Sequence, residues 1–376
     1  MTATAAPQHR FEISREQLAT LLGDQPSYRV DQVWKGFYEQ FRSVDELTNL
    51  SKGLRAELEE QLTDSLELVT ASVSENGDTT KFLWRLHDGA TIETVLMLYP
   101  DRATVCISTQ AGCAMACQFC ATGQAGFDRH LGVGEVVEQV IKAARVAAEG
   151  PTPRRISNIV FMGMGEPLAN YDTTWATAQR LHADVGISAR HLTISTVGII
   201  PGIRRLAAEP LPVNLAVSLH AANDELRDEL VPINKRYPLA DLAEALHGYL
   251  AVKNRRLSFE WAMIDGVNDR DSDAAELAEY ARSLRAHINL IPLNPTPGYP
   301  TVGSTMKRVR EFRQLLEDFG ANATIRQNRG TDIDAACGQL RNVYQRPKDR
   351  RIGERIPEAT RVAVDLARKR SDSLPE

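Results

Sequence analysis

The 376-residue chain lacks the features that mark membrane-spanning, secreted and disulfide-stabilised proteins. No apolar run is long enough to span a bilayer, so a transmembrane protein is not expected. Residues 1–10 carry no signal-peptide pattern, and the five cysteines are odd in number and clustered, which argues against a disulfide framework. With 43% hydrophobic and 25% charged residues, the composition predicts an enzyme of two or three globular domains in the reducing cytosol.

The chain as a whole also has no excess of positive charge. The chain has 44 Lys and Arg against 49 Asp and Glu, a net charge of −5 that gives no sign of a nucleic-acid partner. Residues 341–376, however, hold ten Lys and Arg against six Asp and Glu, so this tail carries +4 and the remainder −9. Phosphate contacts need a local basic patch, which such a tail supplies, but a solvated helix end has the same composition.

Three of the five cysteines lie in one short segment, as Cys113-x3-Cys117-x2-Cys120. Three thiolates from one loop can bind three irons of a four-iron cluster, which leaves the fourth iron open to a small molecule. The alternative is a structural zinc site with Cys106 as the fourth ligand. Such zinc sites usually have two C-x2-C pairs separated by a longer span, and here there is one pair at that spacing. The spacing favours the cluster over zinc.

The same segment resembles the signature of the radical S-adenosylmethionine (SAM) enzymes, in which an aromatic residue, here Phe119, precedes the last cysteine. In that family the open iron binds SAM, and an electron from the cluster cleaves SAM to a 5′-deoxyadenosyl radical. The longer run GCAMACQFCATG at 112–123 is similar to one branch, the RlmN/Cfr RNA adenosine methyltransferases. This resemblance extends over residues 14–345. It implies a 4Fe–4S cluster on the three cysteines, two SAM molecules per turnover, and an electron donor such as flavodoxin or ferredoxin.

The region before the core divides into three parts. Residues 1–13 are rich in Ala and Thr and are expected to be disordered. From 14 to 71 the apolar residues follow a helical period, which predicts three or four short helices in a small accessory domain. Residues 72–98 contain two β-rich runs around Asp88-Gly89, which predict a hairpin leading into the core. The resemblance implies RNA binding by the helical domain, although the helices alone suit a docking or purely structural role equally well.

From Ala103 onward, strand and helix patterns alternate, which predicts an α/β fold with a parallel sheet and helices on one side. The predicted strands are residues 103–108, 158–162, 192–196, 213–219, 258–263 and 288–292, with a further run at 323–327. The resemblance implies that residues 99–340 form the partial (β/α)6 barrel of radical SAM enzymes, followed by the basic tail at 341–376. The cysteine segment then follows the first strand, at the carboxyl ends where barrel chemistry takes place.

A glycine-rich turn, 162–167, follows the second predicted strand. Glycines at a strand end let the backbone approach a ligand closely, although an ordinary tight turn has the same composition. By resemblance, this turn and the ends of later strands bind SAM. The residues implied are Gly165, Glu166, Ser195, Ser218, Leu219, His220 and Asn294. Val197 stands where many relatives carry a second serine, which weakens the polar lining at that point.

Two cysteines remain: Cys106 within the first predicted strand, and Cys337 in a segment between the last strand and the basic tail. A buried free cysteine is ordinarily a small hydrophobic residue, but the resemblance gives these two a joint catalytic task. It also implies that Glu93, in the hairpin, is a base. Without the resemblance, Glu93 would be interpreted as an exposed strand glutamate.

The chemistry explains why two cysteines are needed. C2 of adenine is electron-poor because it lies between two ring nitrogens, so it cannot take the electrophilic methyl group of SAM directly. A thiolate can take it by displacement. The resemblance implies that Cys337 carries this methyl group, that a radical from a second SAM removes one of its hydrogens, and that the carbon radical adds to C2. Glu93 then removes the C2 proton, and Cys106 attacks the bridging sulfur to form a Cys106–Cys337 disulfide.

The resemblance therefore implies a monomeric cytoplasmic enzyme that methylates C2 of an adenosine in 23S rRNA and of an adenosine in tRNA. Two alternatives remain open. The C8-methylating branch shares the cluster and both working cysteines, so these residues do not distinguish methylation at C2 from methylation at C8. A zinc-stabilised RNA-binding protein without catalysis is the alternative from another class.

Overall fold

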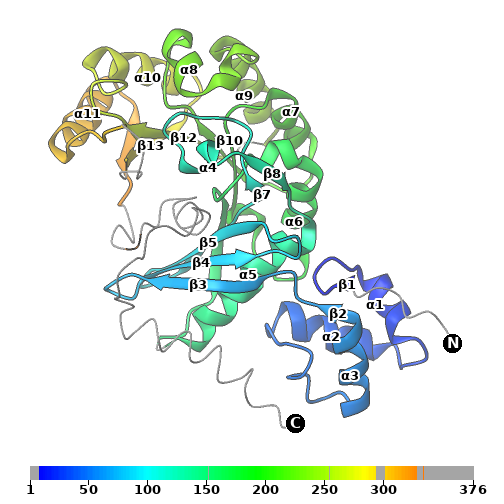
Figure 1. The fold of residues 1–376 in the computed structure, drawn as a ribbon. Coiled ribbons are helices and arrows are strands. Elements are labelled where there is room, and N and C mark those ends of the chain that lie inside the picture. Colours follow the sequence, from blue (N-terminus) through cyan, green and yellow to red (C-terminus); the bar gives the residue numbers. More distant parts are fainter. Residues whose placement is uncertain (1–7, 151, 254, 294–300, 328–332, 334–376) are drawn as a thin grey trace.

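A ten-stranded mixed sheet organises the chain in the computed structural model, which describes residues 8–150, 152–253, 255–293, 301–327 and 333 (Figure 1). The strand order is β14-β13-β12-β11-β10-β9-β6-β5-β4-β3. Seven neighbouring strands run parallel, and each coincides with a predicted strand to within two residues at either end. They are β6 (Ala103–Cys106), β9 (Ile156–Phe161), β10 (Leu192–Thr196), β11 (Asn214–Ser218), β12 (Leu257–Met263), β13 (His287–Pro292) and β14 (Asn322–Ile325).

Three antiparallel strands extend the sheet beyond β6: β5 (Thr91–Leu98), β4 (Thr79–Arg85) and β3 (Glu67–Val73). β4 and β5 form the predicted hairpin around Asp88-Gly89. β3 has no counterpart among the predicted strands, and it crosses the expected boundary between residues 71 and 72. The helical period reaches Leu68, but the β-branched Val69 and Thr70 that follow favour a strand paired with β4.

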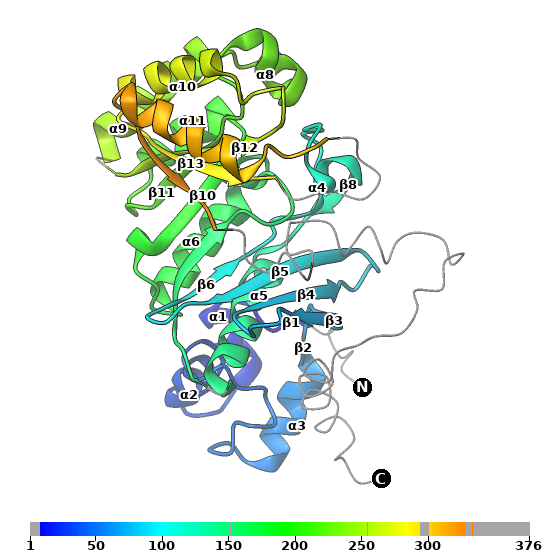
Figure 2. The same ribbon diagram turned by 90° about the vertical axis from the view of Figure 1, so that its left-hand side faces the viewer.

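Helices lie on the outer side of the curved sheet (Figures 1 and 2). The alternation of burial along β10 explains this arrangement, since Leu192 and Ile194 are buried while Thr193 and Ser195 are partly exposed. The helices are α5 (Val133–Glu149), α6 (Tyr171–Ala183), α7 (Ile200–Ala208), α8 (Asp224–Leu230), α9 (Leu239–Lys253), α10 (Asp271–Ser283) and α11 (Met306–Asp318). Among the described residues, none of the helices has the length and apolar character needed to cross a membrane.

The N-terminal helices pack directly against the core. These are α1 (Arg15–Leu22), α2 (Tyr28–Tyr38) and α3 (Lys52–Gln61), and the short strands β1 (Gln8–His9) and β2 (Leu62–Thr63) pair beside them. Trp34 Nε1 donates to Asp184 Oδ1 at 2.9 Å, and Arg145 contacts Glu46 at 2.6 Å. Buried residues form one continuous apolar cluster from Phe11 to the far edge of the sheet. A chain beginning near residue 72 would therefore cut β3 and expose this core.

The N-terminal segment approaches the core closely at Gly134, in the first turn of α5. Its backbone N–H donates to Glu12 Oε2 at 2.5 Å. A Cβ at this position would lie 2.7 Å from the backbone nitrogen of Glu12 and 2.8 Å from Oε2. The residue must therefore be glycine unless the N-terminal segment moves.

We expect Gly134→Ala to destabilise the protein by about 1–3 kcal/mol, because overpacking here displaces backbone. Denaturant unfolding followed by circular dichroism measures the change. Gly53→Ala in α3 is the matched control: nothing lies within 4 Å of its added Cβ, so alanine should stabilise by about 0.5–1 kcal/mol. Equal gains in both variants would contradict the close packing of the N-terminal segment on α5.

Candidate active site

The strand register places a row of polar side chains on one face of the sheet. Lys81 lies opposite Val95, and Val95 lies opposite Cys106, so these positions share a face with Glu93. Further along the same face, Ser218 lies opposite Glu260 and is followed by Asn289 and Thr324. The other face carries buried apolar residues under the helices, among them Ile194, Val217, Phe259 and Leu290.

The cysteine segment is a compact loop between β7 (Gln110–Gly112) and α4 (Ala121–Gln124). β7 pairs with β8 (Phe127–His130), a small hairpin that the sequence patterns do not predict. Gly112 has a φ of +86°, and a Cβ there would lie 2.1 Å from the carbonyl oxygen of Gly126. The Cys113 N–H donates to that same carbonyl at 2.8 Å. The hairpin thus brings both ends of the cysteine loop together.

Burial, with a smaller contribution from the neighbouring Cys120, raises the pKa of the Cys113 thiol to about 12. Burial, together with Cys120 and Cys113, likewise raises the pKa of Cys117. The three thiols are therefore near neighbours in a poorly solvated loop. Thiolates in such a place need a bound cation, so the donor set fits an iron centre.

The position of Cys106 argues against a zinc site with four cysteine ligands. Among the residues that the structure describes, no three His, Cys, Asp or Glu side chains converge closely enough to hold one metal ion. A four-iron cluster takes one thiolate per iron, so its ligands stand further apart than the ligands of tetrahedral zinc. The pKa of Cys106 responds to Arg326, Glu93 and Lys81, on a separate part of the sheet. The zinc site with Cys106 as fourth ligand is not supported by this geometry.

The glycine-rich turn after β9 packs against the strand that leads to the cysteine loop. Gly163 donates to Ile107 O at 3.0 Å, and Gly165 has a φ of +104° with no room for a Cβ beside Gln110. The Glu166 carboxylate turns inward and accepts from the N–H groups of Leu168 at 3.0 Å and Val197 at 2.8 Å. Burial raises the pKa of this carboxyl to about 7. Glu166 therefore joins the ends of β9 and β10.

The turn after β11 holds His220 in a defined state. His220 is a non-glycine residue with a φ of +61°, and its Nδ1 accepts from the Ala262 N–H at 3.0 Å. Burial, with Arg227 nearby, lowers the pKa of His220 to about 3, so the ring is neutral and Nε2 carries the proton. The Phe119 ring meets the His220 ring edge-on, with centroids 4.5 Å apart. The cysteine loop and the end of β11 are thereby in contact.

Arg227, a fully buried residue of α8, has a structural role that the sequence patterns do not reveal. It donates to the carbonyls of Val197 at 2.7 Å and Leu219 at 3.1 Å, and to Asn234 Oδ1 at 2.7 Å. Burial lowers its pKa to about 10, and the cation is retained because these acceptors replace water. Nothing in the sequence around Arg227 separates it from the exposed charges of the same helix.

Glu93 is buried, which corrects the reading of this residue as an exposed strand glutamate. Lys81 Nζ lies 2.8 Å from Glu93 Oε2, and the two side chains are 0% and 2% exposed. Cys106 is partly exposed beside them. Burial raises the pKa of its thiol to about 11, whereas Arg326 and the N–H of Met162 act to lower it.

Ser195 and Ser218 lie on the polar face of the sheet, and the Ser195 hydroxyl donates to Phe161 O at 2.6 Å. Leu219 and His220 follow Ser218 at the carboxyl end of β11. Asn294 and Cys337 lie outside the described residues. The structure therefore brings Glu93 and Cys106 together, and the cysteine loop together with His220.

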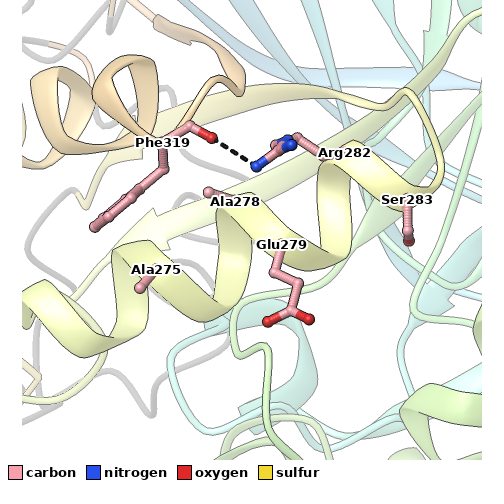
Figure 3. Close-up of a pocket in the computed structure, with 6 residues that line it drawn as sticks. All are labelled: Ala275, Ala278, Glu279, Arg282, Ser283 and Phe319. Carbon is pink, nitrogen blue, oxygen red and sulfur yellow. Dashed lines mark hydrogen bonds between the residues drawn. The ribbon is translucent and has the colours of Figure 1, made fainter.

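A separate hollow of about 610 Å³ lies between α10 and the end of α11 (Figure 3). It is lined by Ala275, Ala278, Glu279, Arg282, Ser283 and Phe319. The carboxyl ends of these helices lead into the amino ends of β13 and β14. The hollow is therefore at the opposite end of the sheet from the cysteine loop, and we assign it no part in the chemistry.

Comparison with known proteins agrees with this geometry. The family model of the radical SAM superfamily matches residues 107–278. The chain is 47% identical over 352 residues to a probable dual-specificity RNA methyltransferase RlmN of Chloroflexus aurantiacus, covering 90% of this chain and 93% of the relative. It is 48% identical over 350 residues to a protein of the same description from Salinispora tropica, covering 90% of this chain and 94% of the relative.

A solved structure extends the likeness to three dimensions. The crystal structure of a radical SAM methyltransferase from Sphaerobacter thermophilus superposes with a TM-score of 0.85 at 47% identity, covering 89% of this chain and 99% of the other. The cysteine loop, the polar sheet face and these likenesses together show that the chain belongs to the RlmN family of RNA methyltransferases, within the radical SAM superfamily.

Proposed function

We propose that this chain methylates C2 of an adenosine in 23S rRNA and C2 of an adenosine in tRNA, through Cys337, Cys106 and Glu93. The observation that carries the proposal is the placement of Cys106 and the buried Glu93 on one face of the sheet. A thiol and a carboxylate are the two groups that release of a cysteine-bound RNA adduct requires. The printed names of relatives 47–49% identical, which describe dual-specificity RNA methyltransferases, support it.

Cys113, Cys117 and Cys120 would hold the 4Fe–4S cluster. SAM would bind beside it, against the polar ends of β9, β10 and β11, through Gly165, Glu166, Ser195, Ser218, Leu219, His220 and Asn294. Once bound, the cluster and SAM supply the methyl group and the removal of a hydrogen from it, with two SAM molecules used per turnover. An electron donor such as flavodoxin or ferredoxin serves as the reducing partner.

The hydrogen bonds of this region indicate which groups remain available to bind SAM and which are already used within the protein. The Glu166 carboxylate is occupied by Leu168 and Val197, so the backbone of the turn is the part suited to approach a ligand. His220 has its Nδ1 bound to the Ala262 N–H, so only Nε2–H is left to donate to a ligand atom. Arg227 holds the carbonyls of Val197 and Leu219 in place and so keeps both loops positioned.

Glu93 would accept the C2 proton, and Cys106 would attack the sulfur of Cys337. The ion pair with Lys81 keeps the Glu93 carboxylate in one orientation. The substrate adenine would therefore lie over the face that carries Glu93 and Cys106, with the cysteine loop at its edge.

We extend the proposal to the fold, the accessory helices and the setting of the enzyme. Six of the seven parallel strands, β6 and β9 to β13, would form the partial (β/α)6 barrel, and the N-terminal helices would contribute affinity for RNA. The enzyme acts as a monomer in the cytoplasm. The C8-methylating alternative uses the same cluster and cysteines. Identification of the methylated nucleoside is therefore needed to distinguish methylation at C2 from methylation at C8.

Nucleoside analysis of the product tests the function directly. Mass spectrometry of digested 23S rRNA and tRNA after reaction should find 2-methyladenosine, and 8-methyladenosine should be absent. With SAM carrying a trideuterated methyl group, the product should keep two deuterons, because one is lost and a solvent proton replaces it. Three retained deuterons would rule out the route through Cys337.

The cluster should depend on Cys113, Cys117 and Cys120 alone. Alanine at any of the three should abolish reductive cleavage of SAM and lower the iron content of the reconstituted protein. Cys106→Ala and Cys337→Ala are the matched controls and should keep iron near the wild-type level, measured by metal analysis and the visible absorption of the cluster. Loss of iron in Cys106→Ala would instead favour a metal site with four cysteine ligands.

The two working cysteines should give opposite phenotypes. Cys106→Ala should stop after carbon–carbon bond formation and accumulate a covalent protein–RNA species, visible as a shifted band on a denaturing gel. Cys337→Ala should form none, because it lacks the sulfur that carries the carbon. Peptide mapping should find the cross-link on Cys337. A fully active Cys106→Ala enzyme would overturn this division of roles.

A further inference from the structure

The amino end of the parallel sheet carries a row of arginines. Four connections lead from the covering helices into β9, β10, β11 and β12, and they span residues 150–155, 184–191, 209–213 and 254–256. These connections contain five arginines against two carboxylates, although the chain as a whole is acidic. The arginines, which we call the basic rim, are Arg154, Arg155, Arg190, Arg255 and Arg256. Because parallel strands begin at one edge of a sheet, the rim lies at the end opposite the cysteine loop.

Hydrogen bonds make the basic rim continuous from one strand to the next. Asn214, the first residue of β11, donates from Nδ2 to Arg190 O at 2.7 Å, and its Oδ1 accepts from Arg255 Nη2 at 3.2 Å. Arg155 Nη2 donates to Gly186 O at 3.4 Å, in the connection that also contains Arg190. From β9 to β12 the rim crosses three strand spacings, a width of about 14 Å.

None of the five rim arginines forms an ion pair within the described part of the chain. The side chains of Arg154, Arg155 and Arg255 donate only to carbonyl or amide oxygens. The side chains of Arg190 and Arg256 are exposed and have no hydrogen-bond partner among the described residues. The positive charge of the rim is therefore not neutralised by carboxylates there and is available to an anion.

The two carboxylates in the same connections are bound elsewhere. Asp184 Oδ1 accepts from Trp34 Nε1 of α2 at 2.9 Å, and Glu209 Oε1 accepts from the Tyr171 hydroxyl at 3.1 Å. The bond between Asp184 and Trp34 also places the end of α6, and with it the start of the rim, beside the N-terminal helices. The rim thus continues the surface of the accessory domain to which we assign affinity for RNA.

We propose that the basic rim binds phosphates of the substrate RNA at a distance from the target adenosine. RNA is a polyanion, and a chain with a net charge of −5 attracts it through a local patch of cations that the protein leaves unneutralised. The inference rests on the proposed function, because that function makes RNA the substrate. It adds a second contact, which positions the RNA and does not read its bases.

The position of the rim determines which RNA molecules can reach it. The candidate active site lies at the carboxyl ends of the strands, and the five residues of β10 alone separate the two ends of the sheet by about 17 Å. A stem-loop that contains only the target loop and its closing pairs has too few phosphates to occupy both ends at once. An intact tRNA or an rRNA domain offers phosphates well beyond the target. The contribution of the rim should therefore depend on the length of the RNA.

The first test measures the RNA affinity of the holoenzyme. The rim variant combines Arg155→Gln, Arg190→Gln and Arg256→Gln, because these three arginines are exposed. Its binding to intact tRNA at low salt should weaken by about ten- to thirtyfold, and the slope of log affinity against log salt concentration should fall by about two to three. Filter binding over a salt series measures both. Lysine at the same three positions should keep both values near the wild type, because a phosphate contact needs the charge.

Arg204, Arg205 and Arg313 provide the matched control, because each is an exposed arginine that already pairs with a carboxylate. Glutamine at all three changes the net charge by the same amount and should leave the affinity and its salt slope unchanged. An equal loss in this control would show an effect of net charge alone and would overturn the proposal. Unchanged affinity in the rim variant would overturn it as well.

The second test varies the RNA in the full reaction. The rim variant should raise KM for intact tRNA and leave kcat unchanged, because phosphates held at the rim take no part in the chemistry. With the target stem-loop alone, the rim variant should match the wild type in both constants. An equal rise of KM for the stem-loop would show that the rim acts close to the reacting base and would overturn the distant contact.

The outcome for the proposed function is measured separately. Absence of 2-methyladenosine from the product of the wild-type enzyme would count against that function, while the binding data would still decide the role of the rim. If the rim variant binds RNA normally but its cluster is reduced more slowly by flavodoxin, the rim binds an acidic protein and the proposal is wrong.

Discussion

The register of the parallel strands is the constraint on which the rest of this structure depends. Because side chains alternate along a strand, one pairing pattern sends Ile194, Val217 and Phe259 under the helices and turns Ser195, Ser218 and Glu260 to the other face. A slip of one residue in any strand would bury the polar set and expose the apolar one. The buried apolar face thus determines which residues face the substrate side.

Buried charges then connect the strand ends that this register brings together. Arg227 and Glu166 are both removed from water, and both are bound by backbone groups of neighbouring loops. Removing such groups from water costs free energy, which their hydrogen bonds offset only if the loops keep one conformation. The loops after β9, β10 and β11 are therefore held in place before any ligand arrives. In the antiparallel part of the sheet, the buried ion pair between Lys81 and Glu93 connects β4 and β5 in a similar way.

Much of the fold could be predicted from the sequence, because apolar strands and amphipathic helices leave clear periodic signals. Such signals predict all seven parallel strands and the β4–β5 hairpin. β3 was missed because Leu68 continues the helical period of the preceding segment. The β7–β8 hairpin was missed because each strand has only three or four residues, too few to show alternation.

The sequence predicts those parts of the candidate site that belong to a recognisable motif. It does not predict the residues whose role depends on tertiary packing. The three cysteines and the glycine turn have characteristic spacing, whereas Arg227 and Lys81 are charged residues in unremarkable surroundings. Their roles arise from what the fold places around them. The burial of Glu93 is of the same kind, because it depends on the pairing of β4 with β5, which places Lys81 beside it.

The β7–β8 hairpin has a consequence for how the cysteine loop acquires its iron. The Cys113 N–H donates to Gly126 O and Gly112 pairs with Phe127, so backbone contacts that involve no thiol join the two ends of the loop. The entropy of closing the loop is therefore lost when the chain folds and not when the metal arrives. Iron–sulfur assembly can then follow folding, on a loop whose ends are already in position. The closure of this loop does not depend on a metal ion, in contrast to small zinc domains, which unfold without their metal.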